Sequence, residues 1–203
     1  MITIINYGLG NLGSIFNMLK KINVKSCIAS KVSEIAKAQK IILPGVGHFD
    51  RAMEGINQSG LKEILEEKAK KEKVPILGIC LGMQLLTKSS EEGQLPGLGW
   101  IPAKTVRFNF PSTSNLKIPH MGWNLVSRST PSLLTEDFES EQRFYFVHSY
   151  HAIVEDEKYS ILKTEHGYAF DSAIQNDNVF GVQFHPEKSH RFGMKLLANF
   201  AKL

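Results

Sequence analysis

The chain has 203 residues, 42% of them hydrophobic and 22% charged, with a formal net charge of +4 at pH 7 and an isoelectric point near 9.0. This length and composition predict one ordinary globular domain over residues 1–203. The positive excess is small and much of the lysine is concentrated in one segment, which argues for solubility and against nucleic-acid binding. No secretory leader precedes the first strand, and no apolar run approaches the roughly 18 residues of a membrane span.

Two cysteines, Cys27 and Cys80, are present. They have neither metal-ligand spacing nor the pattern of a disulfide framework, which indicates a reducing compartment. We therefore expect a cytoplasmic protein that needs no metal and no cofactor and does not contact a membrane.

The first half of the chain alternates short apolar runs with amphipathic segments. This alternation predicts a parallel, doubly wound α/β sheet flanked by helices. The expected strands are residues 1–6, 24–29, 40–43 and 74–79. The expected helices are residues 11–21, a short helix capped by Ser33, and residues 49–57, 61–73 and 81–86.

From residue 95 onward the pattern changes to short strands separated by turns. We expect added antiparallel strands at residues 101–110, 116–126, 143–150, 152–154 and 160–164. Residues 172–175 and 179–184 should form a hairpin around residues 176–178. An amphipathic helix over residues 189–202 closes the chain.

One glycine motif suggests a different function. Gly8-Leu-Gly-Asn-Leu-Gly13 follows a strand and begins a helix, as a dinucleotide-binding fingerprint requires. However, the next strand ends in Ala29-Ser30-Lys31 and lacks the acidic residue that would bind the ribose hydroxyls. A non-catalytic nucleotide-binding module is thus one alternative. The competing interpretation is a tight strand-to-helix turn in which Asn11 serves the helix start or an interface.

The most informative stretch is residues 74–86, an apolar strand that runs into Gly78-Ile-Cys80-Leu-Gly82. Glycines two positions either side of a nucleophile are typical of a sharp strand-to-helix elbow, which exposes the nucleophile above the sheet edge. The start of the following helix favours the thiolate form of a cysteine. Cys80 is therefore the candidate nucleophile.

A cysteine nucleophile needs a base and a residue that orients the base. Among seven histidines, His185 ends an apolar strand, and groups at the carboxyl ends of parallel strands converge on one crevice. Glu187, two residues later, can accept a hydrogen bond from its imidazole. The oxyanion formed during attack needs donors, for which the Leu81 N–H and the Pro44-Gly-Val-Gly47 turn are candidates.

Six motifs follow one another in order over essentially the whole chain: Tyr7-Gly-Leu-Gly-Asn11, Pro44-Gly-Val-Gly-His-Phe49, Gly78-Ile-Cys-Leu-Gly-Met-Gln84, Pro119-His-Met-Gly-Trp-Asn124, Tyr145-Phe-Val-His-Ser-Tyr150 and Gly181-Val-Gln-Phe-His-Pro-Glu-Lys-Ser189. Together they resemble the class I (triad) glutamine amidotransferases, and within them the glutaminase subunits of imidazole glycerol phosphate synthase. The resemblance implies a flavodoxin-like fold with a mostly parallel central sheet and added antiparallel strands.

The same resemblance implies that glutamine is hydrolysed through a thioester on Cys80, with His185 as general acid/base and Glu187 orienting it. It also assigns two further sets of residues. Oxyanion and substrate binding would involve Gly45, Gly47, Leu81, Gln84, Glu92, His148, Ser149 and Tyr150, and the partner interface would include Asn11 and Lys188.

The resemblance further implies a heterodimer with a (βα)8 cyclase subunit that uses the ammonia in histidine biosynthesis. The alternative within the family is a paralogue that supplies ammonia to a sugar amidotransferase in surface-polysaccharide synthesis. Outside the family, a stand-alone cysteine hydrolase or peptidase would use the same elbow without a partner.

Overall fold

The computed structural model describes residues 1–138 and 141–203. Over these residues the strands form one sheet in the order β2-β1-β3-β4-β11-β10-β9-β6-β7, with β5 joined through β8 to β10. Neighbours are parallel from β2 to β11 and antiparallel from β11 onward. This is the predicted mostly parallel α/β sheet with added antiparallel strands.

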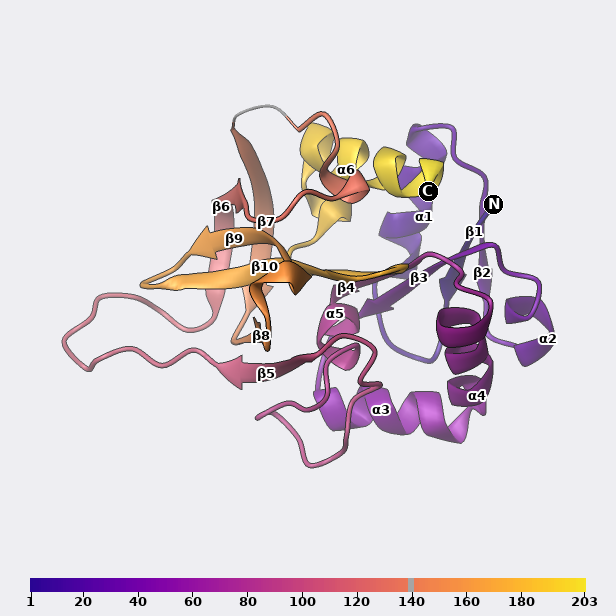
Figure 1. The fold of residues 1–203 in the computed structure, drawn as a ribbon, viewed down its shortest axis with the longest axis horizontal. Coiled ribbons are helices and arrows are strands. Elements are labelled where there is room, and N and C mark those ends of the chain that lie inside the picture. Colours follow the sequence, from indigo (N-terminus) through magenta and orange to yellow (C-terminus); the bar gives the residue numbers. More distant parts are fainter. Residues whose placement is uncertain (139–140) are drawn as a thin grey trace.

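The parallel half consists of β1 (Ile2–Ile5), β2 (Ser26–Ala29), β3 (Lys40–Gly45), β4 (Ile76–Cys80) and β11 (Val179–Val182). Its helices are α1 (Leu12–Lys21), α2 (Val32–Ile35), α3 (Phe49–Gln58), α4 (Leu61–Glu66), α5 (Leu81–Leu85) and α6 (His190–Lys202). Figure 1 shows α1 and α6 on one face of the sheet and α2, α3 and α4 on the other.

Successive strand residues contribute to two hydrophobic cores because side chains alternate across a sheet. In β3, Ile41 and Leu43 face the core under α3 and α4, whereas Ile42 faces the core under α1 and α6. A strand covered by helices on both faces is apolar throughout. This explains why these strands were recognisable as short continuous hydrophobic runs.

The antiparallel half contains β5 (Ala103–Arg107), β6 (His120–Arg128), β7 (Gln142–His148), β8 (Tyr150–Val154), β9 (Ser160–Glu165) and β10 (Ala169–Asn176). Short helices η2 (Leu133–Thr135) and η3 (Glu157–Tyr159) lie between its strands. The predicted hairpin is confirmed: Asn176 pairs with Val179, and Asp177 turns the chain with a φ of +54°.

Several boundaries differ from the sequence predictions for physical reasons. Pro119 has no N–H for a strand ladder, so β6 begins at His120 instead of residue 116. The helix predicted over residues 61–73 leaves the α conformation after Glu66 and ends as a turn of π-helix, η1 (Glu67–Lys71). The predicted Ser33 cap is wrong because α2 already begins at Val32. Instead, the Glu34 carboxylate accepts the N–H groups of Ser30 and Lys31.

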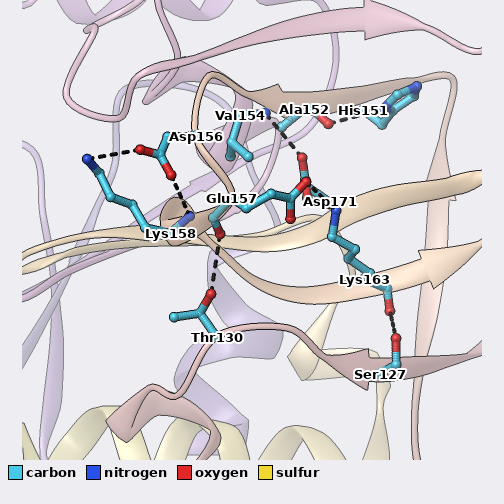
Figure 2. A network of polar contacts seen from close by, with 10 residues as sticks. All are labelled: Ser127, Thr130, His151, Ala152, Val154, Asp156, Glu157, Lys158, Lys163 and Asp171. Carbon is cyan, nitrogen blue, oxygen red and sulfur yellow. Dashed lines mark hydrogen bonds and ion pairs between the residues drawn. The ribbon is translucent and has the colours of Figure 1, made fainter.

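A polar network joins β8, η3, β9 and β10 in the antiparallel half of the sheet (Figure 2). The Lys163 ammonium lies 2.9 Å from Glu157 and 3.5 Å from the buried carboxylate of Asp171. The other carboxylate oxygen of Asp171 accepts the Val154 N–H at 3.1 Å. These contacts fix β8 against β10, and β8 begins at Tyr150 beside the candidate site.

Within the described residues, no helix is both long enough and apolar enough to cross a membrane.

Candidate active site

Cys80 occupies a sharp turn between β4 and α5, with φ of +55° and ψ of −112°. Few non-glycine residues adopt a positive φ, and such strain is concentrated at functional sites. The flanking glycines allow the turn: a Cβ on Gly82 would lie 1.8 Å from the Leu43 carbonyl oxygen, and one on Gly78 would lie 2.6 Å from the Gly82 carbonyl oxygen. The local geometry is therefore that of the predicted nucleophile elbow.

His185 follows β11, which lies parallel to and directly beside β4. Its backbone is held from both sides: its N–H donates to the Tyr145 carbonyl at 2.9 Å, and its carbonyl accepts the Ser189 hydroxyl at 2.6 Å. The short helix η4 (Pro186–Lys188) then turns Glu187 back, so that a carboxylate oxygen lies 2.7 Å from Nδ1 of His185. Both side chains are only 2% exposed.

The charge state of His185 is set by its neighbours. Burial lowers the pKa of His185, but hydrogen bonding and negative charge from Cys80 and Glu187 raise it more strongly, to about 10. Because Glu187 occupies Nδ1 of His185, Nε2 is the ring nitrogen that remains for the interaction with Cys80. The raised pKa means that His185 is an imidazolium near neutral pH, with Cys80 and Glu187 as its neighbours.

A cavity of about 360 Å³ gathers most of the predicted site residues. Its lining includes Gly47, Cys80, Leu81, Gln84, Glu92, His148, Ser149, Tyr150, His185 and Lys188, together with Val46, Pro119 and Val147. These residues come from the ends of β3, β4, β7 and β11, from α5 and from the loop after α5. Such a crevice at the carboxyl ends of parallel strands is where α/β folds bind ligands.

Three predicted residues lie outside the lining. Glu187 lies behind His185. Gly45 packs under the elbow, where a Cβ would lie 2.8 Å from the Tyr7 hydroxyl and 2.9 Å from the Gly82 nitrogen. Asn11 caps α1 by accepting the Ser14 N–H at 3.4 Å.

The glycine turn before α1 packs against the strand that leads to Gly47. A Cβ on Gly10 would lie 3.3 Å from the Pro44 side chain, and Gly8 and Gly10 have φ of +95° and +117°. These glycines therefore serve a tight turn and a close approach to β3. This arrangement fits the tight-turn interpretation of the motif better than a phosphate-binding loop.

The neighbouring residues Glu91 and Glu92 make different contacts, and only Glu92 belongs to the cavity lining. Glu92 lines it, and one oxygen of its carboxylate accepts the Phe49 N–H at 2.8 Å. Glu91 instead accepts the Arg107 N–H at 2.8 Å. Asp50 holds this loop by accepting the N–H groups of Gln94 and Leu95 at 2.9–3.0 Å.

The two residues predicted to donate to an oxyanion, Leu81 and Gly47, both line the cavity. Leu81 is the first residue of α5, so its N–H has no acceptor within the helix. Gly47 lies across the same cavity with φ of +108°, a conformation that side chains disfavour.

Sequence reasoning missed two residues at the site. Gln183 is fully buried; its amide accepts a hydrogen bond from Gln84 at 3.1 Å and donates to the Cys80 sulfur at 3.8 Å. Tyr7 is buried and its hydroxyl donates to the Pro44 carbonyl at 2.5 Å. Gln183 could have been noticed as a polar residue within an apolar strand, whereas the Tyr7 contact depends on tertiary structure.

Comparison with known proteins decides the family. The family model described as "Glutamine amidotransferase class-I" matches residues 3–203. The chain belongs to the class-I glutamine amidotransferases. Within this family it is 54% identical over 202 residues to "Imidazole glycerol phosphate synthase subunit HisH 2" of Methanococcus maripaludis, covering 100% of this chain and 99% of that protein. It is 49% identical over 204 residues to the subunit HisH of Bdellovibrio bacteriovorus, covering 100% of both.

Solved structures support the amidotransferase fold at lower sequence identity. A structure described as "PurLQS from Thermotoga maritima" matches with a TM-score of 0.74 and 18% identity, covering 99% of this amidotransferase and 97% of that chain. Another, described as a glutamine amidotransferase, matches with a TM-score of 0.72 and 14% identity over 100% of both chains. The fold class predicted from the sequence is confirmed.

Proposed function

We propose that this protein is the glutaminase subunit of an imidazole glycerol phosphate synthase and releases ammonia from glutamine. The main support is the full-length identity of 54% and 49% to proteins with that name, combined with a single cavity that gathers the elbow cysteine, the histidine and the substrate-binding candidates. Residues 1–203 would form one amidotransferase domain.

Glutamine fits the chemistry of the cavity. A free amino acid has an ammonium and a carboxylate, so its pocket needs a carboxylate and polar donors. Glu92 supplies the carboxylate, and Gln84 together with the backbone of Ser149 and Tyr150 supplies polar groups. The substrate amide would then reach Cys80.

In the proposed first step, the Cys80 thiolate attacks the side-chain amide carbon of glutamine, and the carbonyl oxygen becomes an oxyanion near the Leu81 N–H and Gly47. The His185 imidazolium gives its proton to the leaving nitrogen, so ammonia departs and a γ-glutamyl thioester remains. His185, now neutral, takes a proton from water as that water attacks the thioester. Glutamate leaves and the thiolate–imidazolium pair is restored. Glu187 holds the imidazole orientation throughout.

The ammonia must reach an acceptor before water protonates it, so the amidotransferase requires a docked partner. We propose a (βα)8 cyclase as that partner, with Lys188 at the pocket rim and Asn11 at the α1 turn in the interface. The relatives' names give no support to a sugar amidotransferase as the acceptor enzyme.

The test is glutamine hydrolysis by the purified protein, alone and with a cyclase subunit and its ribotide ligand. We expect slow hydrolysis alone, strong stimulation by the loaded cyclase, and loss of turnover in Cys80→Ala. Full activity in that variant would exclude the thioester mechanism. Unstimulated activity that is already high would indicate the stand-alone hydrolase instead.

A further inference from the structure

Two buried histidines at the pocket, His120 and His148, have a hydrogen-bond partner at each ring nitrogen. Neither takes part in the mechanism above. His120 is 5% exposed and His148 is 6% exposed. Nδ1 of His148 lies 2.7 Å from the Tyr150 carbonyl oxygen, and its Nε2 lies 3.0 Å from Nδ1 of His120. Nε2 of His120 lies 3.1 Å from the side-chain nitrogen of Asn124.

The direction of each hydrogen bond in this chain is forced. A carbonyl oxygen only accepts, so Nδ1 of His148 carries a proton. Burial lowers the pKa of His148, and burial followed by the charge of His166 lowers the pKa of His120 to about 4, so both rings are neutral near pH 7. Nε2 of His148 therefore accepts from His120, and Nε2 of His120 accepts from Asn124.

This series of hydrogen bonds ends on groups that line the cavity. The Tyr150 carbonyl also accepts the side-chain N–H of Gln84 at 3.2 Å, and Gln84 donates to Gln183 at 3.1 Å. His148, Tyr150 and Gln84 line the cavity. Neither His120 nor Asn124 belongs to that lining, so any influence they have on the substrate passes through His148.

We propose that His120 is a positioning residue for glutamine binding: by donating to Nε2 of His148 it reinforces the Nδ1–H tautomer that holds the Tyr150 carbonyl and the Gln84 amide in place. Without the His120 donor, the ring proton of His148 could move from Nδ1 to Nε2. The Tyr150 carbonyl would then lose the N–H group that donates to it. The substrate end of the pocket would then lose one of its fixed contacts. This inference rests on the proposed glutaminase function.

The neighbouring His166 provides a matched control. Its ring stacks on His120 with centroids 4.2 Å apart, but its Nε2 bonds to the Lys117 carbonyl, outside the chain of bonds to the pocket. Replacing either histidine with phenylalanine alters the same aromatic cluster. Only the His120 replacement removes a donor to His148.

The test compares glutamine kinetics of His120→Phe, His120→Asn and His166→Phe in the complex with the cyclase. Because binding contacts that are equal in ground and transition states change KM alone, we expect His120→Phe to raise KM about tenfold with kcat within about threefold. His120→Asn places an amide N–H near the position of Nδ1 and should return KM to within about threefold of the wild type. His166→Phe should leave KM unchanged.

An unchanged KM in His120→Phe, or an equal rise in His166→Phe, would overturn the proposal. A second readout does not depend on activity: nitrogen-15 spectra of the wild-type protein should show His148 neutral with its proton on Nδ1, and His120→Phe should shift the proton toward Nε2. A wild-type His148 protonated on Nε2 would refute the positioning role even if the protein hydrolyses glutamine. A wild type with the expected tautomer that fails to hydrolyse glutamine would instead reject the proposed function.

Discussion

At the scale of single residues, the elbow depends on the absence of a side chain at Gly82. A Cβ there would overlap the Leu43 carbonyl oxygen, which belongs to the neighbouring strand β3 and cannot move without disturbing the sheet. We expect Gly82→Ala to lower the free energy of unfolding by about 3 kcal/mol, as overpacked core sites do. Chemical denaturation of the purified variant measures this change.

Gly13 is the matched control for that substitution. It is an exposed residue in α1, and a Cβ there would meet nothing within 4 Å. Gly13→Ala should raise stability by about 0.5–1 kcal/mol because alanine loses less backbone entropy in a helix. Equal losses in both variants would contradict the close-approach argument.

The Glu187 carboxylate controls the pH range of the candidate reaction. Its hydrogen bond and charge help to raise the pKa of His185 to about 10, against the opposing effect of burial. Glu187→Gln removes that negative charge, so the pKa of His185 should fall and the imidazolium should be lost at lower pH. The alkaline limb of kcat/KM for glutamine should therefore move from near pH 10 toward neutrality.

The same substitution has a defined effect on stability. A histidine whose pKa is raised in the folded state stabilises the protein fully below its unfolded pKa of about 6.5, and this contribution disappears as pH rises through the folded value. The stability difference between wild type and Glu187→Gln should thus be large at about pH 6 and small above about pH 10. A difference that grows with pH would have the wrong sign for this ion pair.

At the scale of elements, the loop after α5 depends on the first turn of α3. Asp50 accepts the N–H groups of Gln94 and Leu95, and these bonds lower the pKa of Asp50. The stabilisation from these Asp50 hydrogen bonds is therefore fully present above the unfolded-state pKa of about 3.9. It is lost as the pH falls through the lowered pKa of Asp50 in the folded protein. The loop also carries Glu92 to the pocket.

Asp50→Ala should free this loop and weaken glutamine binding through Glu92. We expect KM for glutamine to rise roughly threefold to tenfold with a smaller change in kcat. Glu54→Ala, an exposed position one turn further along α3, serves as the control. A KM that stays at the wild-type value in both variants would show that the loop holds its position without Asp50.

The helices and strands also show which parts of the structure can be predicted from the sequence. The strand before Cys80 and the strand before His185 were recognisable because strands buried on both faces are continuously apolar, and the glycines of the elbow mark a local backbone conformation. The roles of Gln183 and His120 were not predicted because they arise from contacts between residues 28 to 103 positions apart in the chain. No local periodicity encodes such pairings. The late start of β6 and the early end of the helix expected over residues 61–73 likewise reflect hydrogen-bond geometry more than composition.

At the scale of the whole molecule, β6, the second strand from one end of the sheet, leaves apolar side chains exposed. Met121, Trp123 and Leu125 alternate along β6 on one face and are 62%, 44% and 53% exposed. Trp123 contacts the ring of Tyr145, which in turn lies 5.6 Å from the Lys188 ammonium at the cavity rim. Such a stripe is characteristic of protein interaction surfaces, and we propose that the cyclase docks on it.

We expect Trp123→Glu to weaken association with the cyclase at least tenfold and to abolish the stimulation of glutamine hydrolysis, because it places a charge in the centre of the proposed interface. Hydrolysis by the isolated subunit should be unchanged, since Trp123 does not line the pocket. Ile28→Glu is the control: it is 43% exposed on β2, at the opposite end of the sheet order. Titration calorimetry with the cyclase gives the affinities. If Ile28→Glu weakened binding as much as Trp123→Glu, the partner would not dock on the β6 face, and ammonia leaving Cys80 would have to reach it by another route.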